Sequence, residues 1–217
     1  AFVNALAFTA VVVVLQNLIG FGLALALHAQ RPINQVLRAV FFVPCVVSIV
    51  VWGYLFETIL DMRGLLNGFL AVLSGHPVRI AWLGSVRFTI LVVAAVSTWI
   101  WAGFTMMIFV TSINAIPAEI LESARMDGAG YLRTVGNIIV PIIVPGLTVN
   151  LVLTIIGGLK VFDIIMVLTR GGPGRATEVF NTLIYETYSE GRFGYAGAVN
   201  LMLILLISLI AFPIYVN

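Results

Sequence analysis

Five charged side chains lie close together in one stretch of this chain, Asn114–Pro141. They are Glu119, Glu122, Arg125, Asp127 and Arg133. Pro117 can take the first helical position, where its missing N–H costs nothing, and Gly128 can end that helix. Both glutamates then lie in the first turns, where the helix dipole favours acidic side chains. The pattern predicts two short helices around a glycine-rich bend, the second over Tyr131–Asn137, and such a shape suits docking into a partner's groove.

The composition of the chain indicates an integral membrane protein. Hydrophobic residues make up 61% of the 217 residues and charged residues only 9%. A soluble domain carries roughly a quarter charged residues and keeps a large polar exterior, so it could not accommodate this sequence. The formal net charge of +2 gives no reason to expect nucleic acid as a partner. The single cysteine, Cys45, has no second cysteine in this chain with which to form a disulfide.

Five charge-free intervals predict an all-α integral membrane fold, a polytopic helical bundle in a single domain that covers residues 1–217. Each interval can supply the roughly 20 apolar residues that cross a ~30 Å hydrocarbon layer. Lipid requires helices or closed barrels, and runs this long and continuous are helical. Because the chain begins and ends inside apolar sequence, we expect it to be the core of a longer product. The spans are placed near residues 4–27, 37–60, 88–113, 139–168 and 194–216.

Five spans distribute the connections between two sides of the membrane. The charged segment 114–137 shares one side with the connection after the first span, and the loops 61–87 and 170–193 share the other. Arginines are more numerous on the second side, so the positive-inside rule alone would place segment 114–137 outside the cytoplasm. In loop 61–87 the sequence GLLNGFLAVL predicts a short amphipathic helix on the membrane surface, with Trp82 at the interface. The sequence VFNTLIYETY predicts a helix in the other loop.

Polar residues inside the predicted spans are candidates for contact with a solute. Lys160 and Asp163, three residues apart, could share a helix face and pair. Charged groups in spans are functional candidates, although structural ion pairing is the alternative for these two. Deeper polar side chains could line a pathway or simply join helices by hydrogen bonds. Prolines and glycines interrupt the fourth span, either as a plain kink or as a broken helix beside a cavity. The candidate substrate-pathway residues are Asn150, Thr154, Gly157, Lys160 and Asp163.

No motif in the sequence indicates an enzyme. The chain has neither GxSxG nor HExxH, and the predicted spans place His28 and His76 on opposite sides of the membrane. The sequence GGPGR at 171–175 lacks the lysine and the spacing of a phosphate-binding loop. We therefore expect a non-catalytic chain with no catalytic residue, no metal site and no cofactor of its own.

The sequence ESARMDGAGYLRTVGNIIVP resembles the EAA loop of permease subunits in binding-protein-dependent ABC importers. The family pattern is E-A-A, then a glycine four residues on, then I-x-L-P. Here it reads Glu122-Ser123-Ala124, Gly128 and Ile138-Ile139-Val140-Pro141, with Ser for the first Ala and Val for the Leu. The stretches GLKVFDIIMVLTRGGPGRATE at 158–178 and RFGYAGA at 192–198 are similar to carbohydrate-type permeases, those for maltose, other oligosaccharides and glycerol 3-phosphate. The resemblance extends over nearly all of the chain.

The resemblance implies the fold of a type I importer permease and a set of partners. Segment 114–137 would lie in the cytoplasm as a coupling helix docked on one of two ABC ATPase subunits, which bind ATP and Mg. A second, similar but distinct permease would complete the pathway as a heterodimer, and an extracytoplasmic solute-binding protein would deliver a sugar or related solute. The chain would reside in the cell membrane of a prokaryote, surrounded by lipid. The ATPase-coupling residues implied are Glu119, Glu122, Ser123, Ala124, Arg125, Asp127 and Gly128.

An ATP-independent secondary transporter or channel is the alternative function. Such a protein would need no ATPase, and we would expect more acidic residues inside its spans than this sequence contains. The sequence does not identify the solute, because a solute-binding protein would carry much of the selectivity.

Overall fold

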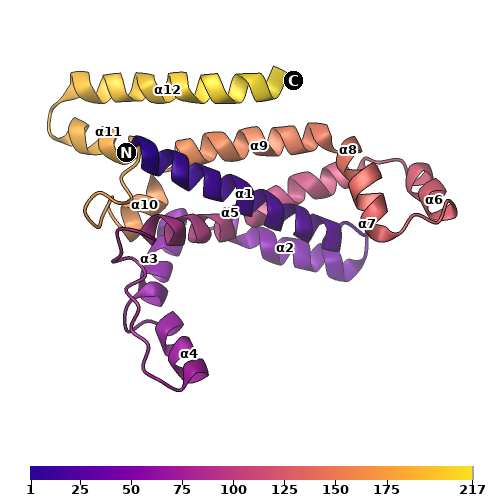
Figure 1. Cartoon of the computed structure of the whole chain (residues 1–217), viewed down its shortest axis with the longest axis horizontal. Helices are drawn as coiled ribbons and strands as arrows, with labels where there is room; N and C mark the ends of the chain where they lie inside the picture. The colour runs from indigo at the N-terminus through magenta and orange to yellow at the C-terminus, as the bar shows by residue number, and fades with distance from the viewer. Residues whose placement is uncertain (217) are drawn as a thin grey trace.

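The computed structural model describes residues 1–216, together with the side chains of all of these except Arg125, Tyr215 and Val216. Within this part of the chain every regular element is a helix, which confirms the predicted all-α fold. The long helices α1, α5, α9 and α12 run along the longest axis of the molecule (Figure 1). In chain order the helices are α1 (Phe2–Leu27), α2 (Pro32–Val46), α3 (Ile49–Leu60), α4 (Leu65–Ser74), α5 (Thr89–Asn114), α6 (Ala118–Met126), α7 (Tyr131–Thr134), a π-helical turn (Val135–Ile139), α8 (Val140–Ile142), α9 (Val144–Leu159), α10 (Asp163–Leu168), α11 (Phe180–Ser189) and α12 (Phe193–Val216).

Three helices are long and apolar enough to cross a membrane, namely α1, α5 and α12. Two further pairs of helices meet the same condition, but each pair is bent at a short break. If each bent pair counts as one span, the described residues supply up to five candidate spans by length and composition.

Helix α5 is the centre of the bundle and packs against α1 along most of its length. One core cluster surrounds Phe8, Val93 and Ile164, and the other surrounds Met106 and Phe109 nearer the opposite end of α5. Helix α2 approaches α5 closely at Gly103, where an added Cβ would overlap the carbonyl group of Phe41. The close contact is available because glycine has no side chain, and small residues commonly allow such approach between membrane helices.

The second predicted span, residues 37–60, is not one continuous helix. Helix α2 ends at Val46, and the segment Ile49–Ser74, which contains α3 and α4, runs at 93° to it. Val47 and Ser48 have extended backbone angles, which interrupt the helical hydrogen bonds. The indole N–H of Trp52 donates to the carbonyl of Pro44 at 2.8 Å and so satisfies a group that the break would otherwise leave free.

The fourth predicted span, residues 139–168, is broken twice. The segment Tyr131–Ile142 is bent by 72° relative to α9, with Ile143 at the corner. Pro145 has no N–H to donate to a carbonyl in the preceding turn, so the helix cannot continue unbroken through it. Helix α9 then ends at Leu159, and Asp163 begins α10 as a separate short helix.

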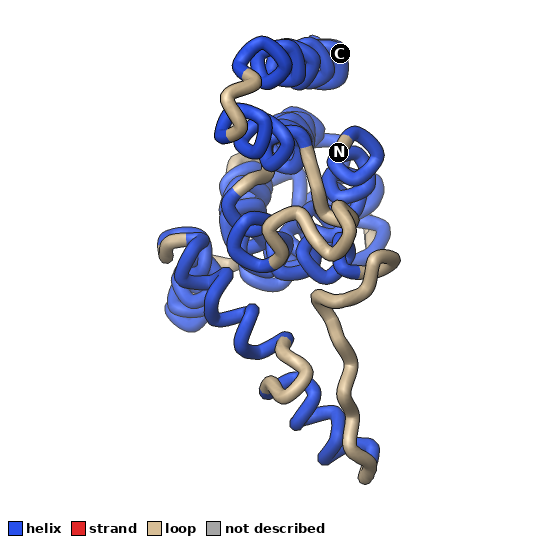
Figure 2. Tube along the Cα trace, turned by 90° about the vertical axis from the view of Figure 1, so that its left-hand side faces the viewer, coloured by secondary structure: helices blue, strands red, loops and turns tan. Residues whose placement is uncertain are grey.

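The polar connections gather at the two ends of the bundle, as the five-span arrangement predicts. Helix α6 lies at one end in Figure 1, and α4, α10 and α11 lie at the other. The amphipathic helix predicted in loop 61–87 is α4, and the helix predicted in loop 170–193 is α11. In Figure 2, which looks towards the end opposite α6, α4 and the loop after it extend away from the other helices.

Candidate functional site

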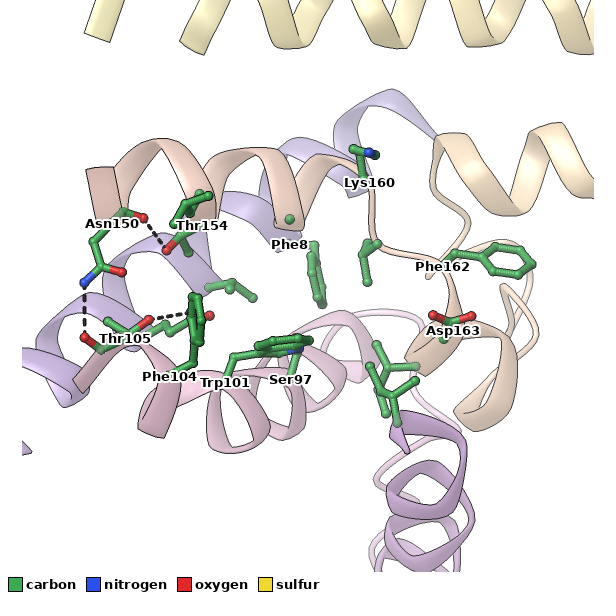
Figure 3. A pocket seen from close by; sticks show the side chains of 18 residues that line it. Phe8, Ser97, Trp101, Phe104, Thr105, Asn150, Thr154, Lys160, Phe162 and Asp163 are labelled. Atoms are coloured by element: carbon green, nitrogen blue, oxygen red, sulfur yellow. Dashed lines mark hydrogen bonds between the residues drawn. The ribbon is translucent and has the colours of Figure 1, made fainter. Parts of the chain in front are cut away.

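The structure brings all five candidate pathway residues to the wall of one cavity of about 320 Å³. These residues are Asn150, Thr154, Gly157, Lys160 and Asp163. The cavity lies between α1, α5, α9 and the chain that joins α9 to α10 (Figure 3). It therefore lies beside the end of the broken fourth span, which favours the cavity-lining interpretation of that break over a plain kink.

Buried amides and hydroxyls join the three helices around the cavity. The Asn150 side chain on α9 donates to the Thr105 carbonyl on α5 at 3.2 Å. The Gln16 side chain on α1 donates to the Thr105 hydroxyl at 2.8 Å. The Thr154 hydroxyl donates within α9 to the Asn150 carbonyl at 2.7 Å and accepts from the Asn17 side chain on α1 at 3.4 Å. The Asn150 Oδ1 atom is buried and has no hydrogen-bond partner among the described residues. The amides of Gln16 and Asn150 thus connect α1 and α9 to α5, and the Asn150 side chain retains an acceptor without a partner among the described residues.

Aromatic side chains form much of the remaining wall. Phe8 on α1 and Trp101 and Phe104 on α5 line the cavity, together with Ser97. Sequence reasoning did not select Trp101, Phe104 or the polar residue Gln16 as pathway candidates. Gln16 carries a detectable signal, because an amide inside a charge-free interval needs a polar partner in lipid. The aromatic residues carry no such signal, since apolar rings are ordinary in a membrane span.

The predicted ion pair between Lys160 and Asp163 is wrong. The prediction assumed a continuous helix, but α9 ends at Leu159 and Phe162 has backbone angles outside the helical range. The three-residue spacing therefore does not bring the two side chains to one helix face. Among the described residues no ion pair joins them, although both line the cavity. Asp163 instead begins α10, where an acidic residue interacts favourably with the helix dipole.

The predicted charged helix is α6, which projects from the end of the bundle opposite α4 (Figure 1). Its residues Glu119, Glu122 and Ser123 are exposed, as is Asp127 just after it, whereas Ala124 is buried. Leu121 packs against the core cluster that contains Ile116 and anchors the helix to the bundle. Arg125 lies in α6, but its side chain is outside the described part of the structure.

Gly128 ends α6 in the way that the sequence predicts. Its φ of +74° is in the left-handed region, which glycine adopts without steric cost. The Ala129 N–H donates to the Ala124 carbonyl at 3.0 Å, the six-to-one hydrogen bond of a Schellman motif. The second predicted helix, Tyr131–Asn137, is α7 followed by the π-helical turn, so it is correctly located but irregular.

Two strongly exposed apolar side chains lie at and just beyond the C-terminal end of this charged helix. Met126 is 88% exposed at the end of α6, and Leu132 is 83% exposed on α7. Large apolar groups that project this far beside exposed acidic groups are typical of a surface that another protein covers. The geometry is consistent with the docking element that the sequence predicts.

Comparison with known proteins assigns the chain to a family. The family model described as binding-protein-dependent transport system inner membrane component matches residues 17–216. The probable ABC transporter permease protein YurN of Bacillus subtilis is 36% identical over 203 residues, which cover 92% of this chain and 70% of YurN. The trehalose/maltose transport system permease protein MalF of Thermococcus litoralis is 32% identical over 201 residues, covering 92% of this chain and 68% of MalF.

A solved structure shares the fold. It is a crystal structure of a bacterial ABC transporter involved in the import of the acidic polysaccharide alginate, with a TM-score of 0.87 and 24% sequence identity. The match covers 97% of this chain and 75% of the solved chain. Together, the family match over residues 17–216 and the relatives above 30% identity confirm the resemblance carried by residues 122–141, and the chain belongs to the binding-protein-dependent transport system inner membrane components, the permeases of ABC importers.

Proposed function

We propose that this chain forms half of the translocation pathway of an ATP-driven importer for a sugar or related solute. Its task is to open the cavity beside α9 alternately to the two sides of the membrane. ATP hydrolysis takes place on partner ATPases, which bind ATP and Mg, and this chain performs no catalysis. The proposal places the protein in the inner membrane of a prokaryote.

The observation that carries this proposal is the direct connection between α6 and the cavity wall. From α6 the chain passes through α7, the π-helical turn and α8 into α9 without leaving helical structure for more than a few residues. Helix α9 then supplies Asn150, Thr154 and Gly157 to the cavity. A displacement of α6 at one end of the bundle would therefore be transmitted to the cavity through a single short segment.

The partner proposed for α6 is an ABC ATPase subunit. The exposed acidic groups of Glu119, Glu122 and Asp127 would face the ATPase, and Met126 would enter an apolar groove on it. Ser123 and Ala124 are small enough to allow close contact, and Gly128 keeps the end of α6 compact. Arg125 belongs to the same proposed surface by its place in the motif.

The cavity chemistry supports a sugar as the solute class. A sugar ring has apolar C–H faces that pack on aromatic rings, and Trp101, Phe104 and Phe8 supply such rings. Its hydroxyl groups both donate and accept hydrogen bonds, and the Asn150 Oδ1 acceptor is without a partner among the described residues. Lys160 and Asp163 at the cavity end add polar groups for the same solute. Relatives of this chain are named as trehalose/maltose, multiple sugar-binding and lactose transport system permeases.

The remaining proposed partners are a second, similar permease and an extracytoplasmic solute-binding protein. Few residues of α12 are buried against the rest of the described structure, so most of its surface is free for lipid or for the second permease. The binding protein would deliver the solute at the end that carries the loops 61–87 and 170–193. One solved relative of the fold is an alginate transporter in complex with a periplasmic protein that binds an alginate pentasaccharide.

The test of the proposal is charge reversal on α6 in the assembled transporter. Glu122→Lys is expected to abolish co-purification with the ATPase, or solute-stimulated ATP hydrolysis in proteoliposomes, because it places a cation in the docking surface. Gly128→Asp is expected to have the same effect. Gln30→Lys is the matched control, since Gln30 is exposed in the α1–α2 connection at the same end of the bundle and outside α6. Normal assembly and normal coupling in both α6 variants would refute the proposal.

The same preparation tests the alternative of a secondary transporter or channel. Proteoliposomes that contain this chain without ATPase are given an ion gradient and a labelled disaccharide. Ion-driven accumulation of the disaccharide would favour the alternative. Uptake that requires the ATPase, ATP and the binding protein would exclude it.

A further inference from the structure

Helix α4 presents a row of apolar side chains that no other part of the described structure covers. Leu65, Phe69, Val72 and Leu73 are spaced as i, i+4, i+7 and i+8 and so lie on one helix face. Their exposed fractions range from 62% for Phe69 to 82% for Val72. Exposure of such a continuous apolar face to water is energetically unfavourable, so we expect lipid or another protein to cover it.

The direction of α4 fits the plane of a membrane rather than its normal. The segment that contains α3 and α4 runs at 93° to α2. Helix α4 lies at the end of the bundle opposite α6 and extends away from the other helices (Figures 1 and 2). An amphipathic helix perpendicular to the spans at one end of a bundle has the geometry of a helix in the lipid headgroup region.

A buried amide holds the loop after α4 firmly against it. The Asn67 side chain is almost fully buried and donates to the Ile80 carbonyl at 2.9 Å. Its Oδ1 atom accepts hydrogen bonds from the Ile80 N–H at 3.2 Å and from the Trp82 indole at 3.1 Å. Further bonds join the amide to the carbonyls of Asp61 and Met62. The helix and its loop therefore form one ordered unit, and Trp82 is of the residue type that favours membrane interfaces.

The charges of this unit are mainly positive. Arg63, Arg79 and Arg87 are exposed, whereas Asp61 is the one acidic residue between positions 61 and 87. The Asp61 carboxylate accepts a hydrogen bond from the backbone N–H of Arg63 at 2.8 Å. Among the described residues none of the three arginines forms an ion pair. Because Ile80 is bonded to Asn67, Arg79 is held beside α4, and Arg63 lies two residues before the helix begins.

We propose that α4 and its loop bind the surface of an anionic phospholipid bilayer. The apolar face enters the boundary of the acyl chains, and Arg63 and Arg79 contact lipid phosphates. The exposed arginines complement lipid phosphates and give no reason to expect a neutral protein surface as the partner. The perpendicular direction of α4 distinguishes this helix from a membrane span. This inference requires only that the chain resides in a membrane, so its failure would leave the proposed transport function intact.

The experiment places a bimane fluorophore on the apolar face in vesicles. The full chain carries Val72→Cys in a Cys45→Ala background, which removes the only native cysteine. The vesicles contain phosphatidylcholine and phosphatidylglycerol, and one lipid at a time is brominated to act as a quencher. Glu190→Cys is the control, because Glu190 is exposed and polar at the same end of the bundle. We expect quenching of bimane at position 72 by both lipids, a preference for brominated phosphatidylglycerol, and little quenching at position 190.

The arginines are tested by Arg63→Gln combined with Arg79→Gln in the Val72→Cys chain. A cationic residue near an anionic bilayer strengthens binding about five-fold, so the preference for phosphatidylglycerol should fall by roughly that factor for each arginine removed. Quenching by aqueous iodide but not by brominated lipid would overturn the proposal, because the face would then be in water. Protection from both quenchers would also overturn it, because protein would then cover the face. An unchanged lipid preference in the double variant would overturn the part assigned to the arginines.

Discussion

Gly128 allows a sharp test of the backbone geometry that ends α6. Its φ is +74°, and a Cβ added there would meet no atom within 4 Å. The cost of Gly128→Ala therefore comes from the left-handed backbone and not from a clash. Gly130 is a matched control, because it also has open space around it but has extended backbone angles, φ −68° and ψ 161°, that alanine adopts freely.

The magnitude follows from comparing the two variants. An L-residue in the left-handed region costs roughly 1–2 kcal/mol. Both substitutions also reduce the entropy of the unfolded chain by a similar amount, about 0.4–1 kcal/mol, which cancels in the difference between them. Gly128→Ala should therefore open the end of α6 roughly 5–30 times more often than Gly130→Ala does.

Hydrogen exchange at α6 measures this difference directly. The Asp127 N–H donates to the Ser123 carbonyl at 2.9 Å and the Ala129 N–H to the Ala124 carbonyl at 3.0 Å, so both amides report on the helix end. Their exchange should be faster in Gly128→Ala than in Gly130→Ala by the factor above. Gly128→Asn should fall between the two, because asparagine tolerates this conformation better than alanine. Equal exchange rates in the two alanine variants would refute the reasoning.

Three further predictions concern the bundle, the unit around α4 and the cavity. Gly103→Ala places a Cβ against the Phe41 carbonyl, and because backbone cannot move like a side chain, the free energy of unfolding should fall by about 1–3 kcal/mol in denaturant titrations. Asn67→Ala removes the hydrogen bonds that join α4 to its loop, so limited proteolysis should cut the loop faster, with a loss of about 1–3 kcal/mol of local stability. Gly157→Leu should fill the cavity and lower solute uptake at least about tenfold, equivalent to roughly 1.4 kcal/mol, without preventing membrane insertion, whereas Gly157→Ala should transport nearly normally because its Cβ meets nothing within 4 Å. Normal uptake in Gly157→Leu would remove this residue from the pathway.

Much of the fold could be predicted from local patterns. The charge-free intervals predict α1, α5 and α12 closely, because lipid requires every backbone group in a span to bond within its own helix. The short helices α4, α6 and α11 follow from apolar spacing and from glycine stops, which are local properties as well. Gly128 is the clearest case, since its conformation depends on the lack of a Cβ and on little else.

The break in the second span and the exact end of α9 could not be located from the sequence, although the prolines and glycines of the fourth span indicated that it would be interrupted. The turn after Val46 is stabilised by the Trp52 side chain, which reaches back to the carbonyl of Pro44. The end of α9 at Leu159 follows no proline, and the glycine pair at 157–158 remains helical up to that point. Whether a glycine-containing turn stays helical depends on how it packs against other helices. Gly158 packs against Thr9 of α1 so closely that a Cβ at this position would contact the threonine.

The residues that line the cavity likewise divide into those that a local sequence pattern predicts and those that only the packing of the helices brings there. Its α9 residues were selected because a broken, polar helix is recognisable in one stretch of sequence. Gln16, Trp101 and Thr105 come from α1 and α5, far along the chain, and only the packing of three helices places them beside Asn150. The hydrogen bond between Asn150 and Thr105 spans 45 positions, and no local pattern encodes that partnership.

The π-helical turn Val135–Ile139 sets the angular phase between α6 and the cavity. One residue of a helix corresponds to a rotation of about 100° and a rise of about 1.5 Å. A π-helical turn contains one more residue than the α-helical turn that it replaces. Removing that residue would rotate α6 and α7 by about 100° relative to α9. Deleting one residue from this turn would therefore present a different side of α6 to a docked partner, although every residue of α6 and of the cavity remained unchanged. The orientation of the docking surface is thus determined by the number of residues between two helices as much as by the residues on them.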